Sequence, residues 1–169
     1  MGPDTATIAQ MLRLNGYNSA MFGKDHNVPK SEQSEAGPFD NWPTGRGFEY
    51  YYGFIAGDND QYSPTLFRGI SRVAPEENKG DLLDKRLADE IIRYVHNQKA
   101  AAPDKPFLIY YAPGSTHAPH QAPADYIARF KGRFDQGWDR MREESYRRQL
   151  TMGIHPKGCL LYTSPSPRD

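Results

Sequence analysis

Two short polar segments contain residue types that could bind and transform an oxyanion. The first, Gly-Lys-Asp-His, contains Lys24 and His26, and the second, over residues 113–120, contains His117. A lysine supplies a compact positive charge, and an imidazole can donate a proton or a hydrogen bond near neutral pH. Where one lysine and two histidines converge on one point, they form a receptor for a tetrahedral oxyanion.

Each polar segment follows a stretch that is predicted to be a β-strand. Residues 17–22 form a short, partly apolar run, and residues 106–111 form an unbroken apolar and aromatic run, typical of a strand covered on both faces. In open α/β sheets, ligands lie outside the carboxyl ends of the strands. We therefore expect the two polar segments to emerge at one edge of the sheet if the two strands are parallel.

The other elements complete an α/β pattern. Apolar residues at every fourth position from 83 to 95 predict a helix that opens at Asp81 and stops before Pro103. Aromatic enrichment predicts a strand over residues 48–55. Further helices are predicted over residues 1–16, 124–131 and 135–152, and loops over 27–46 and 56–80. This alternation indicates an open sheet with helices packed on its faces.

The first helix would enter at Pro3, Asp4 and Thr5 and end at Asn15-Gly16, because glycine takes the left-handed conformation that closes helices. In the last predicted helix, four large side chains could share one face: Trp138, Met141, Tyr146 and Leu150.

Both polar segments, with their surroundings, resemble sulfatases of the alkaline-phosphatase-like superfamily. TATIAQMLRLNGYNSAMFGKDHN is similar to the region in which a helix and a strand deliver a Gly-Lys-x-His motif, and KPFLIYYAPGSTHAPHQAP is similar to a later strand that ends in Thr-His-x-Pro. GPFDNWPTGRGFEYYYGF between them also looks like bacterial arylsulfatases. The resemblance implies a partial alkaline-phosphatase-like α/β fold, with a mixed or mostly parallel sheet flanked by helices.

The resemblance implies roles at three positions. Lys24 matches the lysine that bridges the nucleophile and a sulfate oxygen, and His117 matches the histidine on the sulfate and leaving-group side. His26 matches the histidine that helps to deprotonate the formylglycine hydrate when sulfate leaves. Asp25 departs from the aromatic or amide residue usual between Lys and His in this family, and its carboxylate could pair with Lys24.

Other parts of the family pattern are missing. The nucleophile arises from a Cys or Ser in C/S-x-P-x-R, a spacing that the 169 residues do not contain. The family's calcium ligands cannot be mapped either, so we expect calcium and formylglycine only in a full-length parent protein, and no metal ligand in this chain. Asp58-Asn59-Asp60 is better explained as a turn. Pro119 excludes a regular helix at this point and so argues against a zinc pair of His117 and His120. His120 could instead lie in the cleft behind the residues that contact the substrate.

Composition limits the possible partners and the extent of the domain. Lys plus Arg and Asp plus Glu both number 21, which argues against nucleic-acid or anionic-membrane binding, and no apolar run is long enough to span a membrane. Residues 159–169, with the single cysteine Cys159, resemble translated read-through of a sequencing adapter. We therefore expect residues 1–158 to be a partial N-terminal catalytic domain of a sulfatase, with both ends missing.

The predicted function is that of an arylsulfatase fragment. Its parent would hydrolyse a small-molecule sulfate ester to an alcohol or phenol and sulfate, and the isolated fragment would be inactive. A phosphonate or phosphate ester hydrolase is an alternative, because lysine and histidine receive either oxyanion, and a non-catalytic truncated product is another. The aromatic run Tyr50-Tyr51-Tyr52 is explained either by sheet packing or by a wall against an aryl substrate. Compartment and oligomeric state stay open.

Overall fold

The computed structural model describes residues 4–75 and 80–161. The chain divides into two compact units, residues 1–122 and 123–169. The first unit contains all the strands described: β1 (Asn18–Asp25), β2 (Tyr50–Ile55), β3 (Phe67–Arg68), β4 (Ser71–Arg72) and β5 (Phe107–Ala112). Its helices are α1 (Ile8–Leu14), the short 3-10 helix η1 (Lys30–Glu32) and α2 (Leu83–Ala101).

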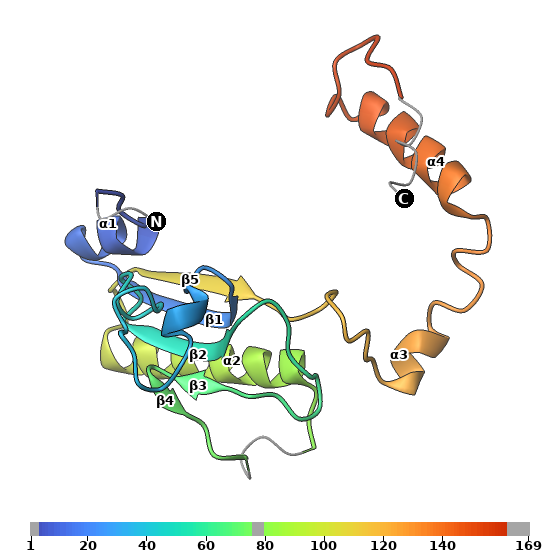
Figure 1. The fold of residues 1–169 in the computed structure, drawn as a ribbon. Helices are drawn as coiled ribbons and strands as arrows, with labels where there is room; N and C mark the ends of the chain where they lie inside the picture. The colour runs from blue at the N-terminus through green and yellow to red at the C-terminus, as the bar shows by residue number, and fades with distance from the viewer. Residues whose placement is uncertain (1–3, 76–79, 162–169) are drawn as a thin grey trace. The chain divides into compact units, whose positions relative to one another are not determined.

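The strands form one mixed sheet in the order β4-β3-β2-β1-β5 (Figure 1). β1 is parallel to both of its neighbours, β2 and β5, whereas β3 and β4 pair antiparallel at the other side. The expectation of an α/β fold with a mixed, mostly parallel sheet flanked by helices is therefore confirmed.

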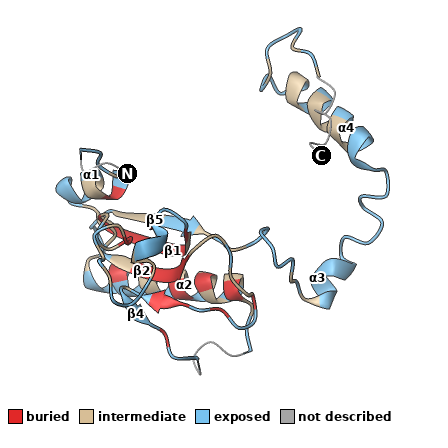
Figure 2. Cartoon of the chain, viewed as in Figure 1, coloured by how far each residue is buried: buried red, intermediate tan, exposed pale blue. Residues whose placement is uncertain are grey.

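Helix α2 covers one face of the sheet. The four-residue repeat predicts its buried side, and Leu83 and Leu87 are both fully buried. Figure 2 shows these buried turns of α2 against the sheet. The core cluster on this face consists of Ala20, Phe22, Tyr52, Phe54, Leu66, Val73, Leu83 and Leu87. Burial of this apolar surface holds the helix on the strands.

The opposite face is covered by the segment between β1 and β2. The prediction of a loop there is largely right, but the loop carries a fully buried side chain, Trp42. The indole Nε1 donates to the carbonyl of Glu32 at 2.7 Å. The ring packs edge-on against Phe39 and Phe67, with distances between ring centroids of 5.2 and 5.0 Å. An irregular segment thus supplies Val28 and Trp42 to the second hydrophobic cluster, which periodicity could not indicate.

The first helix and the first strand begin and end at other residues than predicted. Helix α1 starts at Ile8 because Thr7 caps it: Thr7 Oγ1 accepts from the Gln10 amide at 3.1 Å, and Gln10 Oε1 accepts from the Thr7 amide at 2.8 Å. The predicted entry at Thr5 is therefore wrong, and residues 1–3 lie outside the described part. Strand β1 continues to Asp25, so that Lys24 belongs to the strand and does not follow it.

The prediction that the strand over 106–111 is covered on both faces is wrong. Within the described ranges β5 lies at the edge of the sheet, and Tyr110 and Tyr111 are 51% and 42% exposed. An unbroken apolar run predicts a strand. It does not distinguish a central strand from a strand at the edge of the sheet that is exposed on one side.

The second unit contains α3 (Ala124–Ala128) and α4 (Trp138–Thr151). Both are shorter than predicted. Trp138 is 87% exposed, whereas Met141, Tyr146 and Leu150, with which it was expected to share a face, are half-buried. Most of the predicted adapter-derived tail, residues 162–169, lies outside the described residues.

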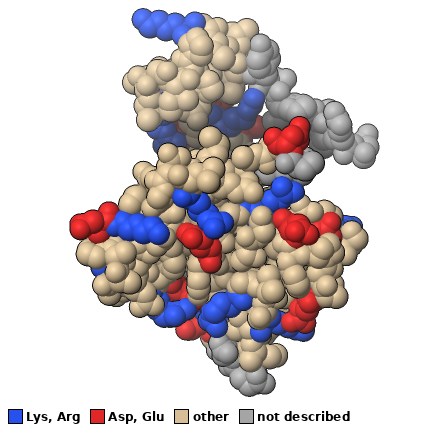
Figure 3. Space-filling view, turned by 90° about the vertical axis from the view of Figure 1, so that its left-hand side faces the viewer, with Lys and Arg blue, Asp and Glu red and all other residues tan. Residues whose placement is uncertain are grey.

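The surface carries charges of both signs. Positive and negative side chains alternate over the face in Figure 3, in keeping with the equal totals of acidic and basic residues. Among the residues that the structure describes, no helix is both long enough and apolar enough to cross a bilayer.

Candidate active site

His26 and His117 line one cavity of about 500 Å³ at the carboxyl edge of the parallel strands. The other residues that line it come from the segments after β1 and β2: Val28, Lys30, Gln33, Ala56, Gly57 and Asp58. The polar groups in the lining are two imidazoles, one ammonium group, one carboxylate and one amide. The structure thus brings together the two histidines of the polar segments that the sequence singled out.

Parallel pairing explains why these distant residues meet. His26 follows directly on Asp25, the last residue of β1, and His117 lies on the segment that leaves β5 after Ala112. Because β1 and β5 are hydrogen-bonded parallel neighbours, both segments emerge at the same edge. Strand β2, which precedes Asp58 in the chain, ends at this edge as well.

Lys24 occupies a different position. Successive side chains of a strand alternate between its faces, so Lys24 lies on the α2 face with Phe22 and its register partner Phe54. The side chain is half-buried, and Lys24 is not among the residues that line the histidine cavity. The structure therefore unites two of the three predicted site residues in the cavity and leaves the third, Lys24, outside its lining.

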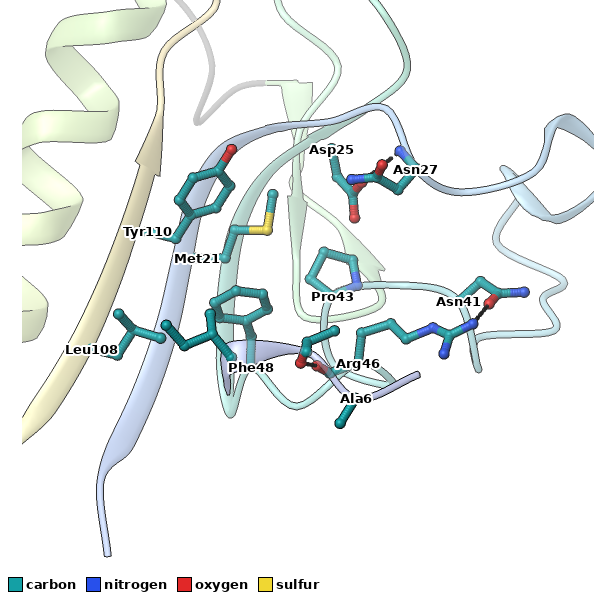
Figure 4. A pocket seen from close by; sticks show the side chains of 12 residues that line it. Ala6, Met21, Asp25, Asn27, Asn41, Pro43, Arg46, Phe48, Leu108 and Tyr110 are labelled. Atoms are coloured by element: carbon teal, nitrogen blue, oxygen red, sulfur yellow. Dashed lines mark hydrogen bonds between the residues drawn. The ribbon is translucent and has the colours of Figure 1, made fainter. Parts of the chain in front are cut away.

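Asp25 points to the face opposite Lys24. Its carboxylate accepts from the Asn27 amide at 2.8 Å instead of pairing with Lys24 (Figure 4). Burial raises the pKa of the Asp25 carboxyl above its ordinary value, and the hydrogen bonds from Asn27 offset this only in part. Asp25 lines a second cavity of about 470 Å³, which is mostly apolar and includes Met21, Phe48 and Tyr110.

The segment that carries His117 is held by hydrogen bonds from two sides. The Asp84 carboxylate, in the first turn of α2, accepts from the amides of Gly114 and Ser115 at 2.9 and 3.3 Å. On the other side Gln121 donates to Asp60 and accepts from the Gln61 amide, each at 2.7 Å. Sequence reasoning missed these anchors, because an Asp in a first helical turn is already explained by the helix dipole.

His26 rests against a tight turn. A Cβ built on Gly57 would lie 2.9 Å from His26 Cε1, so the backbone of residue 57 packs directly on the imidazole. The preceding Ala56 has φ of 133°, a conformation that residues with a side chain rarely adopt, and its amide donates to the carbonyl of Asp25 at 2.9 Å. This turn leads from β2 to Asp58, which lines the same cavity as His26.

The acidic turn has a structural explanation that agrees with the prediction. Asp60 Oδ1 accepts from the amides of Tyr62 and Ser63 at 2.8 and 2.7 Å, and Asn59 Oδ1 accepts from the Thr65 amide at 3.1 Å. The hydrogen bond from Gln121, followed by those two amides, holds the Asp60 pKa below its usual value. Within residues 4–75 and 80–161, no three His, Cys, Asp or Glu side chains gather in a way that could hold a metal ion.

The tyrosine run packs in the sheet. Tyr51 is fully buried and Tyr52 is 5% exposed, on opposite core faces, and Tyr50 donates its hydroxyl to the buried Glu90 of α2. These rings lie outside the histidine cavity, so the sheet-packing alternative holds. His120 is exposed and is not among the residues that line that cavity either.

The sequence of this chain is similar to a known protein family and to known proteins. The family model described as Sulfatase matches residues 2–156. An uncharacterized sulfatase of Escherichia coli, YdeN, is 33% identical over 133 residues, which cover 69% of this chain and 23% of that protein. An arylsulfatase of Klebsiella aerogenes is 26% identical over 157 residues, covering 88% of this chain and 32% of that protein. The chain spans about a quarter to a third of the length of these relatives.

Solved structures share the fold. A protein of a Bacteroides thetaiotaomicron glycosaminoglycan locus superposes with a TM-score of 0.60 at 17% identity, covering 78% of this chain and 30% of that one. A protein solved with its substrate D-glucosamine-2-N,6-O-disulfate gives a TM-score of 0.56 at 20% identity, covering 78% and 23% of the two chains. The match of the Sulfatase family model over nearly the whole length shows that the chain belongs to the sulfatase family.

Proposed function

We propose that this chain forms the sulfate-binding part of a sulfuric ester hydrolase. The observation that carries the proposal is the meeting of His26 and His117 in one cavity, in a chain that belongs to the sulfatase family. The overall reaction would consume a sulfate ester and water, break the bond between sulfur and the ester oxygen, and release an alcohol or phenol with sulfate and a proton.

The three predicted site residues divide this work. Lys24 would neutralise charge on a sulfate oxygen, which grows as the ester bond breaks. His117 would hydrogen-bond the sulfate and protonate the departing ester oxygen. His26 would remove a proton on the nucleophile side of the sulfate. Lys24 lies one residue before the end of β1, on the α2 face, and its role is assigned by its match to the lysine of the Gly-Lys-x-His motif.

The finer assignment is to arylsulfatases, with a formylglycine nucleophile and calcium contributed by the rest of the parent protein. It is supported by the arylsulfatase of Klebsiella aerogenes among the relatives. The 169 residues contain no C/S-x-P-x-R motif, and the described side chains do not fit a metal site. The chain by itself should therefore not turn over sulfate esters.

The test begins with the native reading frame on both sides of this segment. A C/S-x-P-x-R codon set upstream is expected, and the reconstructed enzyme should hydrolyse an aryl sulfate faster than the matching aryl phosphate. His26→Ala and His117→Ala should each lower kcat by about 10²–10⁴-fold. His96→Ala on α2, outside the cavity, is the matched control and should change little.

Two outcomes would contradict the proposal. A preference for the phosphate ester would assign the site to phosphate or phosphonate ester hydrolysis. Sulfate ester turnover by the isolated 169-residue chain would show that its chemistry needs no nucleophile from elsewhere.

A further inference from the structure

Gln121 bridges the two segments that line the histidine cavity after β2 and after β5. Its Nε2 donates to Asp60 Oδ2 and its Oε1 accepts from the Gln61 amide, each at 2.7 Å. Asp60 and Gln61 follow the cavity-lining Gly57 on the first segment, and Gln121 follows His117 on the second. One side chain therefore joins segments that lie 60 residues apart in the sequence.

The bridge needs a side-chain amide. An ionised carboxylate such as that of Asp60 accepts hydrogen bonds, whereas the backbone N–H of Gln61 donates. Glutamine presents one donor and one acceptor, and both are used here. The Asp60 carboxylate is itself fixed, because its other oxygen, Oδ1, accepts from the amides of Tyr62 and Ser63 at 2.8 and 2.7 Å.

The other end of the His117 segment is held by helix α2. The Asp84 carboxylate accepts from two backbone amides of the segment at 2.9 and 3.3 Å. The neighbouring residue, Leu83, is fully buried, and its amide donates to the Gln61 carbonyl at 2.7 Å. Both anchors thus lead to the first turn of one packed helix. Since His117 itself is exposed, its position depends on these hydrogen bonds more than on packing.

The backbone of this segment also orients the His117 ring. Nδ1 of the ring lies 2.9 Å from the carbonyl oxygen of Ala118. A carbonyl oxygen can only accept, so the hydrogen bond requires the proton on Nδ1 and leaves Nε2 as the ring atom that can meet a ligand. Because the partner is the adjacent backbone, a shift of the segment would break this bond.

On the basis of the proposed sulfate site, we infer that Gln121 and Asp60 are positioning residues that act through His117. Their hydrogen bond holds the backbone where Nδ1 of His117 bonds to Ala118 and Nε2 is left for the sulfate. Neither Gln121 nor Asp60 lines the cavity, so neither contacts the substrate.

Three variants isolate the bridge. Gln121→Glu puts a carboxylate oxygen against the Asp60 carboxylate, and Asp60→Asn puts a donor against the Gln121 donor. In the double variant, the new amide at position 60 donates to the new carboxylate at position 121, whose second oxygen accepts from the Gln61 amide. The double variant restores both hydrogen bonds and has the net charge of the parent chain. Gln136→Glu, at an exposed residue of the second unit, is the matched control.

The first measurement is the tautomer of the His117 ring in the full 169-residue chain, without any ligand. Long-range proton–nitrogen NMR spectra at about pH 8.5, where imidazoles are neutral, give this tautomer, and His117→Gln assigns the signals. The parent chain, Gln136→Glu and the double variant should carry the proton on Nδ1. Gln121→Glu and Asp60→Asn should each give a mixture with the proton on Nε2.

The second measurement is the affinity for sodium sulfate, from the shifts of the imidazole C–H proton signals near neutral pH. Each single variant should bind sulfate about tenfold more weakly than the parent chain, and the double variant should bind within about twofold of it.

The outcomes separate the two proposals. An unchanged His117 tautomer in Gln121→Glu and Asp60→Asn, or a double variant that does not restore it, would overturn the positioning role and leave the sulfate site intact. A tautomer that follows the substitutions, in a parent chain whose imidazole signals ignore sulfate, would support the positioning of the ring and overturn the sulfate site.

Discussion

At the scale of single residues, Gly23 determines how closely β1 and β5 can pair. Its φ is +101°, and a Cβ at this position would lie 1.9 Å from the carbonyl oxygen of Ala112. On the β2 side, a Cβ built on Gly53 would likewise lie 1.9 Å from the carbonyl oxygen of Gly23. The strands that deliver the two histidines therefore depend on two positions without side chains.

Gly23→Ala should destabilise the chain by more than about 3 kcal/mol, because the methyl group overlaps backbone that cannot move away. Gly80→Ala is the matched control, since Gly80 has a similar φ of +98° but nothing within 4 Å of a built Cβ. It should cost about 1–2 kcal/mol, the conformational penalty alone. Urea unfolding followed by circular dichroism measures both, and equal losses would show that the contact with Ala112 is not limiting.

Asp60 should make stability depend on pH in the acid range. Its pKa is lower in the folded chain than its ordinary value of 3.8, chiefly through the hydrogen bond from Gln121. The stabilisation is then fully present above that ordinary value and is lost as the pH falls through the lower folded pKa. Asp60→Asn should be less stable than the parent chain near neutral pH, and the difference should shrink on acidification.

Denaturant unfolding from about pH 7 to about pH 3 measures this effect. Asp104→Asn, an exposed carboxylate outside these hydrogen bonds, serves as the control and should follow the parent chain. A constant difference between Asp60→Asn and the parent at all pH values would contradict the assignment.

The sequence predicts the location of His26 and His117 better than their surroundings. The strand-then-polar-segment pattern is local, and the rule on carboxyl ends places both histidines at one edge. The face on which the Lys24 side chain lies depends on where β1 ends. The hydrogen bonds of Asp84 and Gln121 that hold the His117 segment join residues far apart in the chain. Element ends and long-range hydrogen bonds leave no periodic trace in a sequence.

At the scale of elements, α2 holds the sheet through a narrow apolar stripe. Leu87 is fully buried at the middle of that stripe and packs in the cluster of Phe22 and Phe54. Leu87→Ala should cost about 2–5 kcal/mol, through lost burial and the cavity left behind. Ile92→Ala on the same helix, where the side chain is 54% exposed, should cost under about 0.5 kcal/mol.

Calorimetric unfolding of the two variants checks this prediction. Similar losses for Leu87→Ala and Ile92→Ala would mean that α2 is not packed on the sheet through Leu87.

Elements differ in how far their sequence predicts them. The apolar repeat of α2 identifies both the helix and its buried face, because packing and periodicity coincide there. In contrast, the loop around Trp42 covers a sheet face without any period, and the position of β5 at the edge depends on pairing across the whole sheet. The fold class follows from the alternation of elements, whereas the strand order does not.

At the scale of the whole molecule, both hydrophobic core clusters lie within residues 20–87. The first compact unit ends at residue 122. A chain that stops after Ala122 should therefore keep a cooperative thermal transition within a few degrees of that of the full chain, while losing the helical signal of α3 and α4. Scanning calorimetry and circular dichroism measure the two effects. Loss of the transition on truncation would show that residues 123–169 are required for the fold.

The placement of the two tryptophans has an optical consequence. Trp42 is fully enclosed in the first unit, and Trp138 is 87% exposed in the second. The emission of the enclosed indole should be shifted to shorter wavelength and shielded from acrylamide, whereas the exposed indole should emit at longer wavelength and be quenched. The intrinsic fluorescence of the unlabelled chain therefore reports on each unit separately, with no dye attached.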